Sequence, residues 1–340
     1  MTTTAPVVFG LIGAGAIGAF HAESLARRIP EARLAAVADP RPEAAQQLAA
    51  SLDVPRPTSD PSDLFADPDI EAVVITTPPQ FHTDLIETAA AAGKAVFCEK
   101  PMALSLADAD RAITATAKAG VALQIGFNRR YDRGFRAGHD LVTSGGIGRP
   151  QLLRSLTRDP ELSDPARVPA WGIFLETLIH DFDTLNWLNL GTRATEVYAT
   201  ADALVRPDWK ERGLLDTALV HVRYDNGAMA TAEASFQALY GYDVRGEVFG
   251  SEGMATMGDI RPSTMTAYGA HGVRSDSVRR NVDLFHDAYT AQLTEFARCV
   301  RNETPPQTTG EDARSALAIA LAAIESVRTG QTVRIDSIEQ

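Results

Sequence analysis

Three residues have the types and positions of a site that handles the proton of a hydroxyl group: Lys100, Glu176 and His180. Lys100 lies in a Glu-Lys-Pro tripeptide, residues 99–101, directly after the apolar run 95–98, where a buried strand would end. In an open α/β sheet ligands bind outside the carboxyl ends of the strands, so we expect Lys100 to face a ligand. The alternative interpretation is an ordinary charged turn that closes the strand.

Glu176 and His180 are four residues apart in the segment 170–190, which we interpret as one amphipathic helix. On a helix such residues are neighbours, with about 5 to 6 Å between their Cβ atoms. A carboxylate beside an imidazole orients the ring and raises its basicity, which suits proton acceptance near neutral pH. The alternative is a surface pair without a chemical role. We expect Asp181 and Asp183 to be capping or solvated acids.

A glycine-rich turn after the apolar run 7–12 predicts a dinucleotide site. The turn is Gly13-Ala14-Gly15-Ala16-Ile17-Gly18. We expect Gly13 to allow a tight turn, Gly15 to let the backbone approach a pyrophosphate, and Gly18 to let a helix pack closely on the strand. Ala16 and Ile17 begin that helix, whose free N–H groups would point at the phosphates.

Asp39 ends the second apolar run, 34–38, and lies 21 positions after Gly18. A carboxylate here binds the 2′-hydroxyl of the adenosine ribose and repels a 2′-phosphate, so NAD is favoured over NADP. Arg41 is the competing feature, because its guanidinium can pair with a 2′-phosphate. Thr77 and Glu99 follow two further predicted strands and are expected to border the same cofactor.

The order of apolar and polar runs predicts two domains, as the length of 340 residues suggests. In residues 1–126 strands alternate with helices, which indicates an NAD-binding Rossmann domain, an α/β fold with a doubly wound parallel sheet. The strands expected there are 7–12, 34–38, 72–76, 95–98 and 123–126.

Residues 127–340 are expected to form an α+β domain for substrate binding and oligomerisation, with a large, mostly antiparallel open sheet. Asn-Gly at 226–227 separates two alternating runs and predicts a hairpin. The strands expected are 151–158, 194–204, 216–224, 228–236 and 241–249, and the closing helices are 284–300 and 312–328.

Composition argues against several functions. The chain has 32 Lys and Arg against 44 Asp and Glu, a net charge of −12, which argues against nucleic-acid binding. No apolar run approaches the ~20 residues of a membrane span and the N-terminus lacks a signal pattern, so we expect a cytoplasmic protein without a membrane partner. Cys98 and Cys299 are expected to be reduced core residues, and no histidine or cysteine spacing predicts a metal site.

The remaining histidines are expected to have no part in catalysis. His82 follows Thr77-Pro78-Pro79 and is interpreted as a structural or cofactor-adjacent residue. The others have no partner at an informative spacing; they are His21, His139, His221, His271 and His286.

Together, the glycine turn, Asp39, residues 99–101 and residues 176–183 resemble the Gfo/Idh/MocA oxidoreductases, and within them most closely the inositol 2-dehydrogenases. The resemblance covers nearly the whole chain, including residues 127–132 and 240–243. It implies that a secondary hydroxyl of a cyclic polyol or sugar is oxidised to a ketone as hydride passes to the nicotinamide. It also implies a homo-oligomer, most often a tetramer, built on the open face of the sheet.

The resemblance assigns a role to each candidate residue. Lys100 would hydrogen-bond the reacting hydroxyl, His180 would accept its proton, and Glu176 would complete the relay. Pro101 would fix the turn that holds the lysine, with a cis peptide bond as one way to do so. Arg129 would line an entrance shared by cofactor and substrate.

Two further sets of residues are expected to contact the substrate. Tyr240 and Tyr242, two apart on a predicted strand, would face the same way and border the sugar ring, with a core role for one of them as the alternative. Thr157 and Asp159 stand where inositol dehydrogenases have a His and Asn pair, and Glu176 stands where they carry aspartate. The substrate prediction is therefore a polyol or sugar, without a choice among them.

Two other functions fit the same sequence. One is a redox glycosidase of the same family, which oxidises C3 transiently, eliminates the aglycone and reduces the sugar again with the same NAD. The other is a non-catalytic dinucleotide-binding regulator. The presence of both Lys100 and His180 argues against the regulator, because a sensor needs neither.

Overall fold

The computed structural model describes residues 5–161, 169–212 and 214–338. By its internal contacts the chain divides into two compact units. The first unit comprises Met1–Tyr131 with Asp287–Arg314, and the second comprises Asp132–His286 with Ser315–Gln340. The sequence predicted one boundary, at residue 126. In the structure the first unit extends five residues further, to Tyr131, and the later segment Asp287–Arg314 also belongs to it.

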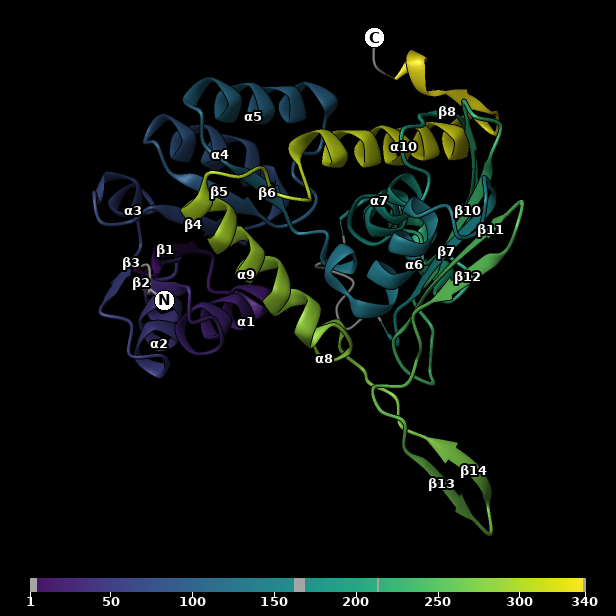
Figure 1. Ribbon diagram of the computed structural model, residues 1–340, viewed down its shortest axis with the longest axis horizontal. Coiled ribbons are helices and arrows are strands. Elements are labelled where there is room, and N and C mark those ends of the chain that lie inside the picture. Colours follow the sequence, from purple (N-terminus) through teal and green to yellow (C-terminus); the bar gives the residue numbers. More distant parts are fainter. Residues whose placement is uncertain (1–4, 162–168, 213, 339–340) are drawn as a thin grey trace. The chain divides into compact units, whose positions relative to one another are not determined.

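The first unit is built on a parallel sheet of six strands in the order β3-β2-β1-β4-β5-β6 (Figure 1). The strands are β1 Val7–Ile12, β2 Ala32–Ala38, β3 Arg56–Thr58, β4 Ala72–Ile75, β5 Ala95–Cys98 and β6 Leu123–Ile125. The strand order reverses between β1 and β4, which is where a doubly wound sheet opens its ligand crevice. The predicted Rossmann fold is confirmed; the sequence missed only β3, which is short and largely exposed.

Helices flank this sheet and have local signals at their ends. The helix α5 begins after Ser105, whose hydroxyl accepts the N–H of Asp108 at 3.1 Å, and ends at Gly120, with φ of 67°. The helices are α1 Ala16–Glu23, α2 Pro42–Ser51, α3 Ser62–Ala66, α4 His82–Ala91, α5 Leu106–Ala119 and α9 His286–Asn302. A π-helical turn, Ser24–Arg28, extends α1.

The helix α9 explains why the first unit includes a late segment of the chain. Its Phe296 packs between Phe9 of β1 and Phe97 of β5, with both pairs of ring centroids 6.0 Å apart. Leu293 and Ala297 are buried in the same core. A stripe of apolar residues predicts that a helix is covered on one face but not which sheet covers it, so the sequence could not assign α9 to the first unit.

The second unit is built on a seven-stranded sheet in the order β12-β11-β7-β10-β9-β8-β15. All neighbours are antiparallel except β7 and β10, which confirms the mostly antiparallel prediction. The strands are β7 Pro150–Arg158, β8 Ala194–Asp202, β9 Thr217–Tyr224, β10 Met229–Ser235, β11 Asp243–Gly250, β12 Met254–Met257 and β15 Val333–Arg334. The predicted hairpin joins β9 and β10, with Gly227 at φ of 87°.

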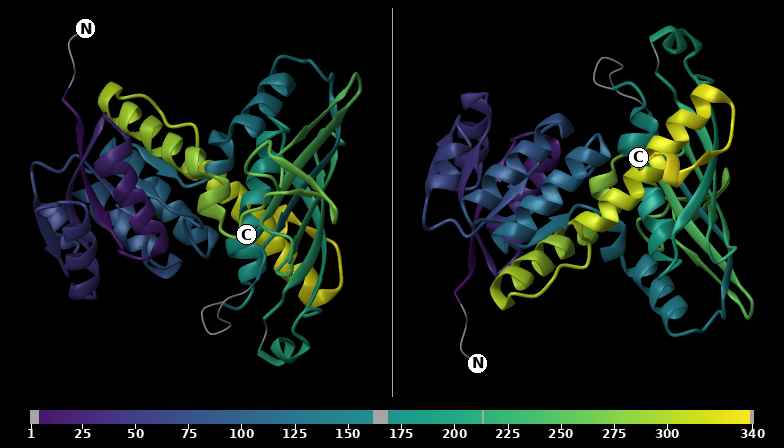
Figure 2. Two further views of the ribbon diagram at one scale, coloured as in Figure 1. Left: turned by 90° about the horizontal axis from the view of Figure 1, so that it is seen from below. Right: turned by 90° about the horizontal axis from the view of Figure 1, so that it is seen from above.

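Helices cover one face of this sheet and leave the other uncovered (Figure 2). On the covered face Ala230, Ala232 and Ala234 are buried, while the intervening residues of β10 remain partly exposed. The hydroxyl oxygen of Ser326 in α10 accepts a hydrogen bond from the N–H of Ala199 in β8 at 2.9 Å. The remaining elements are α6 Arg133–Thr143, α7 Ile179–Trp187, α8 Asn281–Leu284, α10 Gly310–Thr329, and a separate hairpin of β13 Thr266–Gly269 with β14 Gly272–Ser275.

Two composition-based predictions concern cysteines and membrane spans. Cys98 and Cys299 are both buried and free, as predicted, and burial raises the pKa of the Cys98 thiol well above its usual range. Among the helices of the described ranges, none combines the length and apolar character that crossing a membrane requires.

Candidate active site

The glycine turn between β1 and α1 has the shape that its sequence predicts. Gly13 has φ of 107°, and a Cβ at this position would lie 2.8 Å from the carbonyl oxygen of Thr76. A Cβ at Gly18 would lie 2.0 Å from the carbonyl oxygen of Gly13. Both positions therefore require glycine for reasons internal to the protein.

Gly15 differs, because a Cβ there would meet no atom within 4 Å. Gly15 and Ala16 are exposed, Ile17 is half-buried, and no side chain caps the N-terminus of α1. No contact among the described residues explains a glycine at position 15. Open space above uncapped N–H groups, with no acidic side chain in the first turn, fits a pyrophosphate.

Asp39 is buried at the end of β2, with its carboxylate facing the glycine turn. Its Oδ2 accepts the N–H of Ala14 at 2.8 Å, and its Oδ1 accepts the N–H and Nε of Arg41 at 2.9 and 3.0 Å. Burial opposes the charge, but the Arg41 guanidinium and the backbone N–H groups outweigh it and lower the pKa of Asp39. The carboxylate is therefore ionised at neutral pH, which fits a ribose diol and disfavours a 2′-phosphate.

Lys100 and Glu99 follow β5. Lys100 is half-buried, and its bond to Pro101 is cis. Glu99 is buried: its Oε1 accepts Nε2 of His21 at 2.7 Å, and its Oε2 accepts the N–H of Lys100 at 3.3 Å. The sequence showed no partner for His21 at an informative spacing, and the structure gives it one 78 positions away, which no local spacing can reveal.

His82, at the start of α4, connects two turns. Its Nδ1 lies 2.8 Å from the carbonyl oxygen of Pro101 and its Nε2 lies 2.8 Å from that of Thr77. Burial lowers the pKa of His82, although both carbonyl contacts act in the opposite direction. The structure thus gives His82 a bridging position beside Lys100, in agreement with a structural or cofactor-adjacent role.

Glu176 and His180 lie on one helical segment of the second unit, but not on a regular α-helix. Residues Ile173–Thr177 form a π-helical turn in which the N–H of Leu178 bonds the carbonyl of Ile173 at 2.9 Å. The α-helix α7 begins only at Ile179. The expected single helix over 170–190 is therefore corrected, and the side-chain spacing of an ideal α-helix does not apply to Glu176 and His180. Both residues are half-buried.

Thr157 holds this segment on the sheet. Its hydroxyl donates to Oδ2 of Asp181 at 2.7 Å, and the hydroxyl of Ser155, also on β7, donates to Oδ1 at 2.5 Å. Asp181 and Asp183 are both buried, so the expectation of capping or solvated acids is wrong. Two hydroxyl donors on one strand face compensate for the burial of the Asp181 carboxylate. Asp159, directly after β7, is half-buried.

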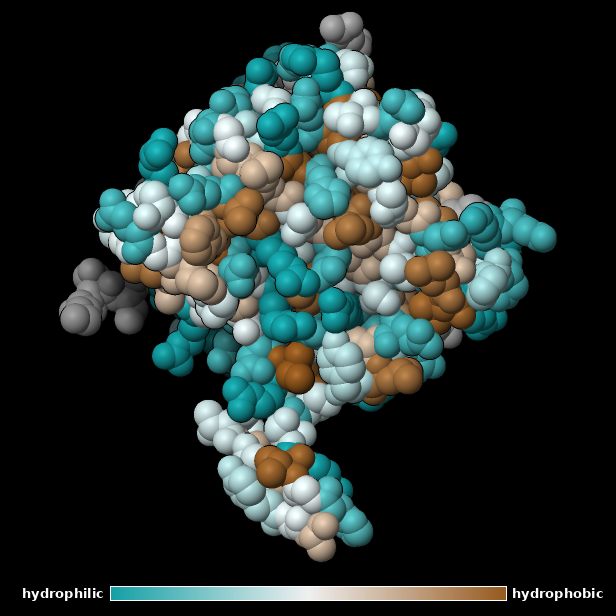
Figure 3. All heavy atoms as spheres, turned by 90° about the vertical axis from the view of Figure 1, so that its right-hand side faces the viewer, coloured by the Kyte–Doolittle hydropathy of each residue, from teal (hydrophilic) through white to brown (hydrophobic). Residues whose placement is uncertain are grey.

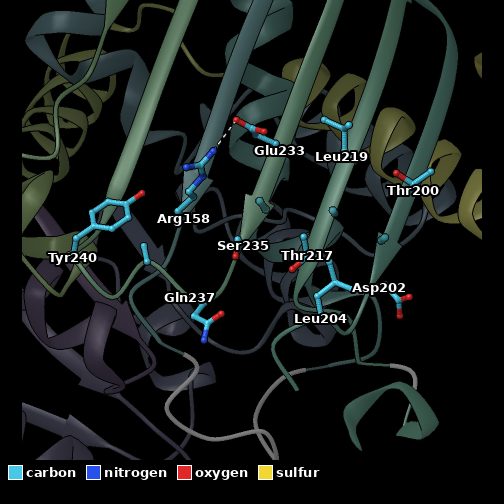
Figure 4. Close-up of a pocket in the computed structure, with 14 residues that line it drawn as sticks. Arg158, Thr200, Asp202, Leu204, Thr217, Leu219, Glu233, Ser235, Gln237 and Tyr240 are labelled. Carbon is cyan, nitrogen blue, oxygen red and sulfur yellow. Dashed lines mark hydrogen bonds and ion pairs between the residues drawn. The ribbon is translucent and has the colours of Figure 1, made fainter. Parts of the chain in front are cut away.

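The two tyrosines predicted to lie on a strand lie before it, since β11 begins at Asp243. Tyr240 is 48% exposed and donates to Oδ2 of Asp243 at 2.7 Å. It lines a pocket of about 570 Å³ with Arg158 and Glu233 on the uncovered face of the sheet (Figure 4). Tyr242 is half-buried, and its N–H donates to the carbonyl oxygen of Val278 at 2.7 Å. The sheet thus separates Tyr240 from Thr157, which faces α7.

Arg129 lies in the 3₁₀ turn Asn128–Tyr131 and is only 3% exposed. The neighbouring Arg130 is also buried, and its guanidinium donates to the carbonyl of Gln307 and the carboxylate of Asp312, both at 3.0 Å. Arg130 therefore fixes the end of the sheet to a late segment of the first unit. That Arg129 lines an entrance shared by cofactor and substrate stays a prediction.

Each unit thus gathers its own part of the predicted site. In the first unit the glycine turn, Asp39, Thr77, Glu99 and Lys100 all follow strands at the carboxyl edge of the parallel sheet. In the second unit Glu176 and His180 lie on the helical segment that Asp181 ties to β7. Within the described ranges, no group of three histidine, cysteine, aspartate or glutamate side chains could hold a metal ion.

Two family profiles match the chain. The first, described as an oxidoreductase family with an NAD-binding Rossmann fold, matches residues 7–127. The second, the GFO/IDH/MocA C-terminal domain, matches residues 135–256. The first match contains the glycine turn and Lys100, and the second contains Glu176 and His180.

Curated and solved relatives extend the similarity to nearly the full length. The chain is 38% identical over 332 residues to the myo-inositol 2-dehydrogenase of Thermotoga maritima, covering 97% of this chain and 98% of that protein. It is 37% identical over 328 residues to the NAD-dependent scyllo-inositol 2-dehydrogenase of Bacillus subtilis, covering 96% and 95%. The structure of scyllo-inositol dehydrogenase from Lactobacillus casei with NAD(H) and scyllo-inositol matches with a TM-score of 0.93 at 28% identity, covering 97% and 99%.

Proposed function

Because the chain belongs to the GFO/IDH/MocA family of oxidoreductases, we propose that it is an NAD-dependent dehydrogenase that oxidises one secondary hydroxyl of an inositol or a related cyclic polyol to a ketone. The observation that carries the proposal is a half-buried lysine, Lys100, at the sheet edge where the glycine turn leaves open space for a pyrophosphate. Relatives named as inositol dehydrogenases over nearly the full length support the substrate class.

The cofactor would be held by the glycine turn at its pyrophosphate and by Asp39 at the adenosine ribose. When bound, NAD accepts the hydride that leaves the substrate carbon. Lys100 would hydrogen-bond the substrate oxygen through Nζ, and His180 would accept the hydroxyl proton. Glu176 would orient the His180 ring. Such a proton acceptor typically contributes about 10²- to 10⁴-fold in rate.

The proposal also includes the other predicted substrate contacts, Arg129, Thr157, Asp159, Tyr240 and Tyr242. Arg129 is buried in the turn after β6, and Asp159 is half-buried directly after β7. Thr157 would support the site by holding Asp181 and with it the segment of His180. Tyr242 would contact the substrate from the turn before β11. Tyr240 faces a different side of the sheet from Thr157, so a substrate bound beside Thr157 would not contact Tyr240 in this conformation.

A polyol panel tests the proposal directly. The purified enzyme is offered myo-inositol, scyllo-inositol, inosose, glucose and galactose, and formation or consumption of NADH is followed by absorbance. We expect NADH from at least one inositol. Lys100→Ala and His180→Ala should lower kcat by about 10²-fold or more while NAD still binds.

Exposed residues provide matched controls for these two variants. Lys118→Ala on α5 and His271→Gln in the β13–β14 hairpin should turn over substrate like the wild type, because both side chains are exposed. If Lys100→Ala and His180→Ala also turn over polyols at the wild-type rate, the catalytic assignment is wrong. Release of an aglycone without net NADH would instead favour the glycosidase.

We further propose a homo-oligomer, expected to be a tetramer, that forms through the uncovered face of the second unit. Apolar side chains lie among hydrophilic ones on this face (Figure 3). Four of them form a row in register across β12, β11, β7 and β10, and each is 43% to 51% exposed. The row consists of Met254, Phe249, Leu152 and Met229. Contiguous exposed apolar surface of this kind is typical of protein interfaces.

A cytoplasmic location completes the proposal. The NAD pool that such an enzyme uses is intracellular, and both cysteines are free thiols, as is usual in a reducing compartment.

A further inference from the structure

A buried carboxylate beside Lys100 has a role that hydride transfer to NAD does not by itself explain. Glu99 is 6% exposed, and its two oxygens accept from Nε2 of His21 and from the N–H of Lys100. The space for this carboxylate depends on Gly126, where a Cβ would lie 2.8 Å from Oε2 of Glu99. A buried charge held by two donors and accommodated by a glycine is a built feature of the site.

The surroundings of His21 determine the charge of the pair. His21 is fully buried, and its ring packs edge-on against Phe97 and Tyr289, with centroid distances of 5.5 and 5.9 Å. Among the described residues its Nδ1 has no hydrogen-bond partner. A proton on Nδ1 would be a buried donor without an acceptor, which is unfavourable. We therefore assign the ring proton to Nε2, where it is donated to Oε1 of Glu99, and place the negative charge of the pair on the carboxylate.

The sheet order places this charge on the nicotinamide side of the crevice. Asp39 follows β2, on one side of the switch point between β1 and β4, and Glu99 follows β5, on the other. A doubly wound sheet binds the two halves of a dinucleotide on the two sides of this point. Since Asp39 takes the adenosine ribose, the nicotinamide half belongs to the side of Glu99 and Lys100.

We infer that Glu99, held by His21, is a positioning residue whose negative charge favours the oxidised, cationic nicotinamide over the reduced, neutral ring. The oxidised ring carries one positive charge, which hydride transfer removes. A fixed negative charge on this side therefore stabilises NAD⁺ relative to NADH and also anchors the turn of Lys100. The inference rests on the proposed hydride transfer, but its test uses the cofactor alone.

The test compares the binding of NAD⁺ and NADH to wild type and to Glu99→Gln, by calorimetry at one pH and salt concentration. Glutamine keeps the size of the side chain and an acceptor for His21 but removes the charge. We expect the ratio of Kd for NAD⁺ to Kd for NADH to rise by roughly threefold to tenfold, as for a unit charge acting across a partly shielded site. A role in anchoring the turn alone would weaken both ligands equally.

Two further variants keep the result interpretable. Glu71→Gln removes a partly buried carboxylate from the opposite end of the sheet, where it bonds the N–H of Val8 and Arg301, and should leave the ratio unchanged. His21→Phe keeps the aromatic packing but removes the donor to Glu99. Because the buried carboxylate then lacks the donor that compensates its charge, the ratio should move in the same direction as in Glu99→Gln.

An unchanged ratio in Glu99→Gln, or an equal change in Glu71→Gln, overturns the inference. A wild-type ratio in His21→Phe would show that His21 is not needed for the effect of Glu99. If His21→Phe does not fold, Glu99→Gln alone decides. Because no polyol is present, failure to oxidise inositols would contradict the proposed function without altering this result.

Discussion

At the scale of single residues, the candidate site is made of side chains whose partners define what they can do. Asp39 illustrates this, because the same carboxylate holds the glycine turn through Ala14 and holds Arg41 in place. Arg41 is the group that the sequence identified as able to favour a 2′-phosphate, yet its guanidinium lies on Asp39 and is 67% exposed. We therefore expect Asp39 and Arg41 together to decide between NAD and NADP.

Replacing Asp39 should change the cofactor preference. In Asp39→Ala the ribose 2′-hydroxyl loses its acceptor and Arg41 becomes free to meet a 2′-phosphate. We expect NAD to bind about 10-fold to 100-fold more weakly, corresponding to about 1.5 to 3 kcal/mol for a hydrogen bond to a charged group, while NADP binding improves. Titration of both cofactors measures the ratio.

Arg41→Ala and the double variant complete this experiment. Arg41→Ala alone should retain NAD binding, since Asp39 stays in place. The gain in NADP binding should disappear in Asp39→Ala/Arg41→Ala. An unchanged NAD to NADP ratio in Asp39→Ala would remove the electrostatic argument for cofactor choice.

At the scale of elements, side-chain contacts connect the turns that follow the parallel strands to one another and to the helices α1 and α4. His82 of α4 contacts the carbonyls of Thr77 and Pro101, Glu99 after β5 bonds His21 of α1, and the glycine turn is fitted against Thr76. The turns after β1, β4 and β5 therefore form one connected layer. A substitution in this layer should lower the stability of the fold where the new side chain meets protein atoms, and should weaken ligand binding where it meets open space.

Gly15 and Gly18 should separate those two costs. Gly15→Ala adds a methyl group into open space, so the melting temperature should stay close to that of wild type while NAD binding weakens by about tenfold or more, because the pyrophosphate loses its close approach. Gly18→Ala places the methyl group against the carbonyl of Gly13 and should destabilise the fold by several kcal/mol. Thermal melts with NAD titrations measure both. Equal loss of stability in the two variants would show that Gly15 is structural.

His82 should make the stability depend on pH. Its pKa in the folded protein is lowered from 6.5, mainly by burial, so between the folded and unfolded pKa values the unfolded chain binds more protons. Stability is therefore complete above about pH 6.5 and is lost as the pH falls through the lowered pKa. In His82→Gln the decrease in stability between pH 7 and pH 5 should be smaller, as measured by denaturant unfolding.

The exposed His271 offers the control for this titration. His271→Gln should keep the wild-type pH dependence, because its ring is exposed in the β13–β14 hairpin. If His82→Gln loses stability with acid as steeply as wild type, other groups produce the effect. Glu99 and Lys100 are the charged groups that act on the His82 ring, so Glu99→Gln should make the wild-type decrease steeper.

At the scale of the whole molecule, the chain combines a cofactor-binding unit with a unit whose sheet has one covered and one uncovered face. Helices bury the small side chains of the covered face, and Asp181 ties the segment of Glu176 and His180 to it. The uncovered face instead presents the apolar row across four strands. The two faces therefore serve different purposes, one for the proposed chemistry and one for the proposed assembly.

Charges introduced into the apolar row should prevent assembly. Leu152→Asp with Met229→Asp places two carboxylates at paired positions of β7 and β10, and burying them against a partner would be strongly unfavourable. We expect sedimentation velocity to show a smaller species than wild type, with an unchanged circular dichroism spectrum. Leu104→Asp, at an exposed position of the first unit, should assemble normally. A wild-type mass for the double variant would exclude this face as the interface.

The sequence by itself determined what depends on neighbours along the chain. The sequence predicted the order of the longer strands, the glycine turn, Asp39 after β2 and Lys100 after β5, because residue type and short spacing define turns and strand ends. It did not predict the short strands β3, β12, β13, β14 and β15. The Asn-Gly hairpin and the alternating burial of β10 followed for the same reason.

Only the tertiary structure decided which distant segments meet. The pair of His21 with Glu99, the hold of Ser155 and Thr157 on Asp181, and the packing of α9 on the first sheet all join residues from separate elements. The π-helical turn before His180 is also a tertiary result, since an apolar pattern close to a period of 3.6 cannot show one extra residue in a turn. The role of a buried polar side chain depends on the hydrogen-bond partner that compensates for its burial, and tertiary packing determines which residue that partner is.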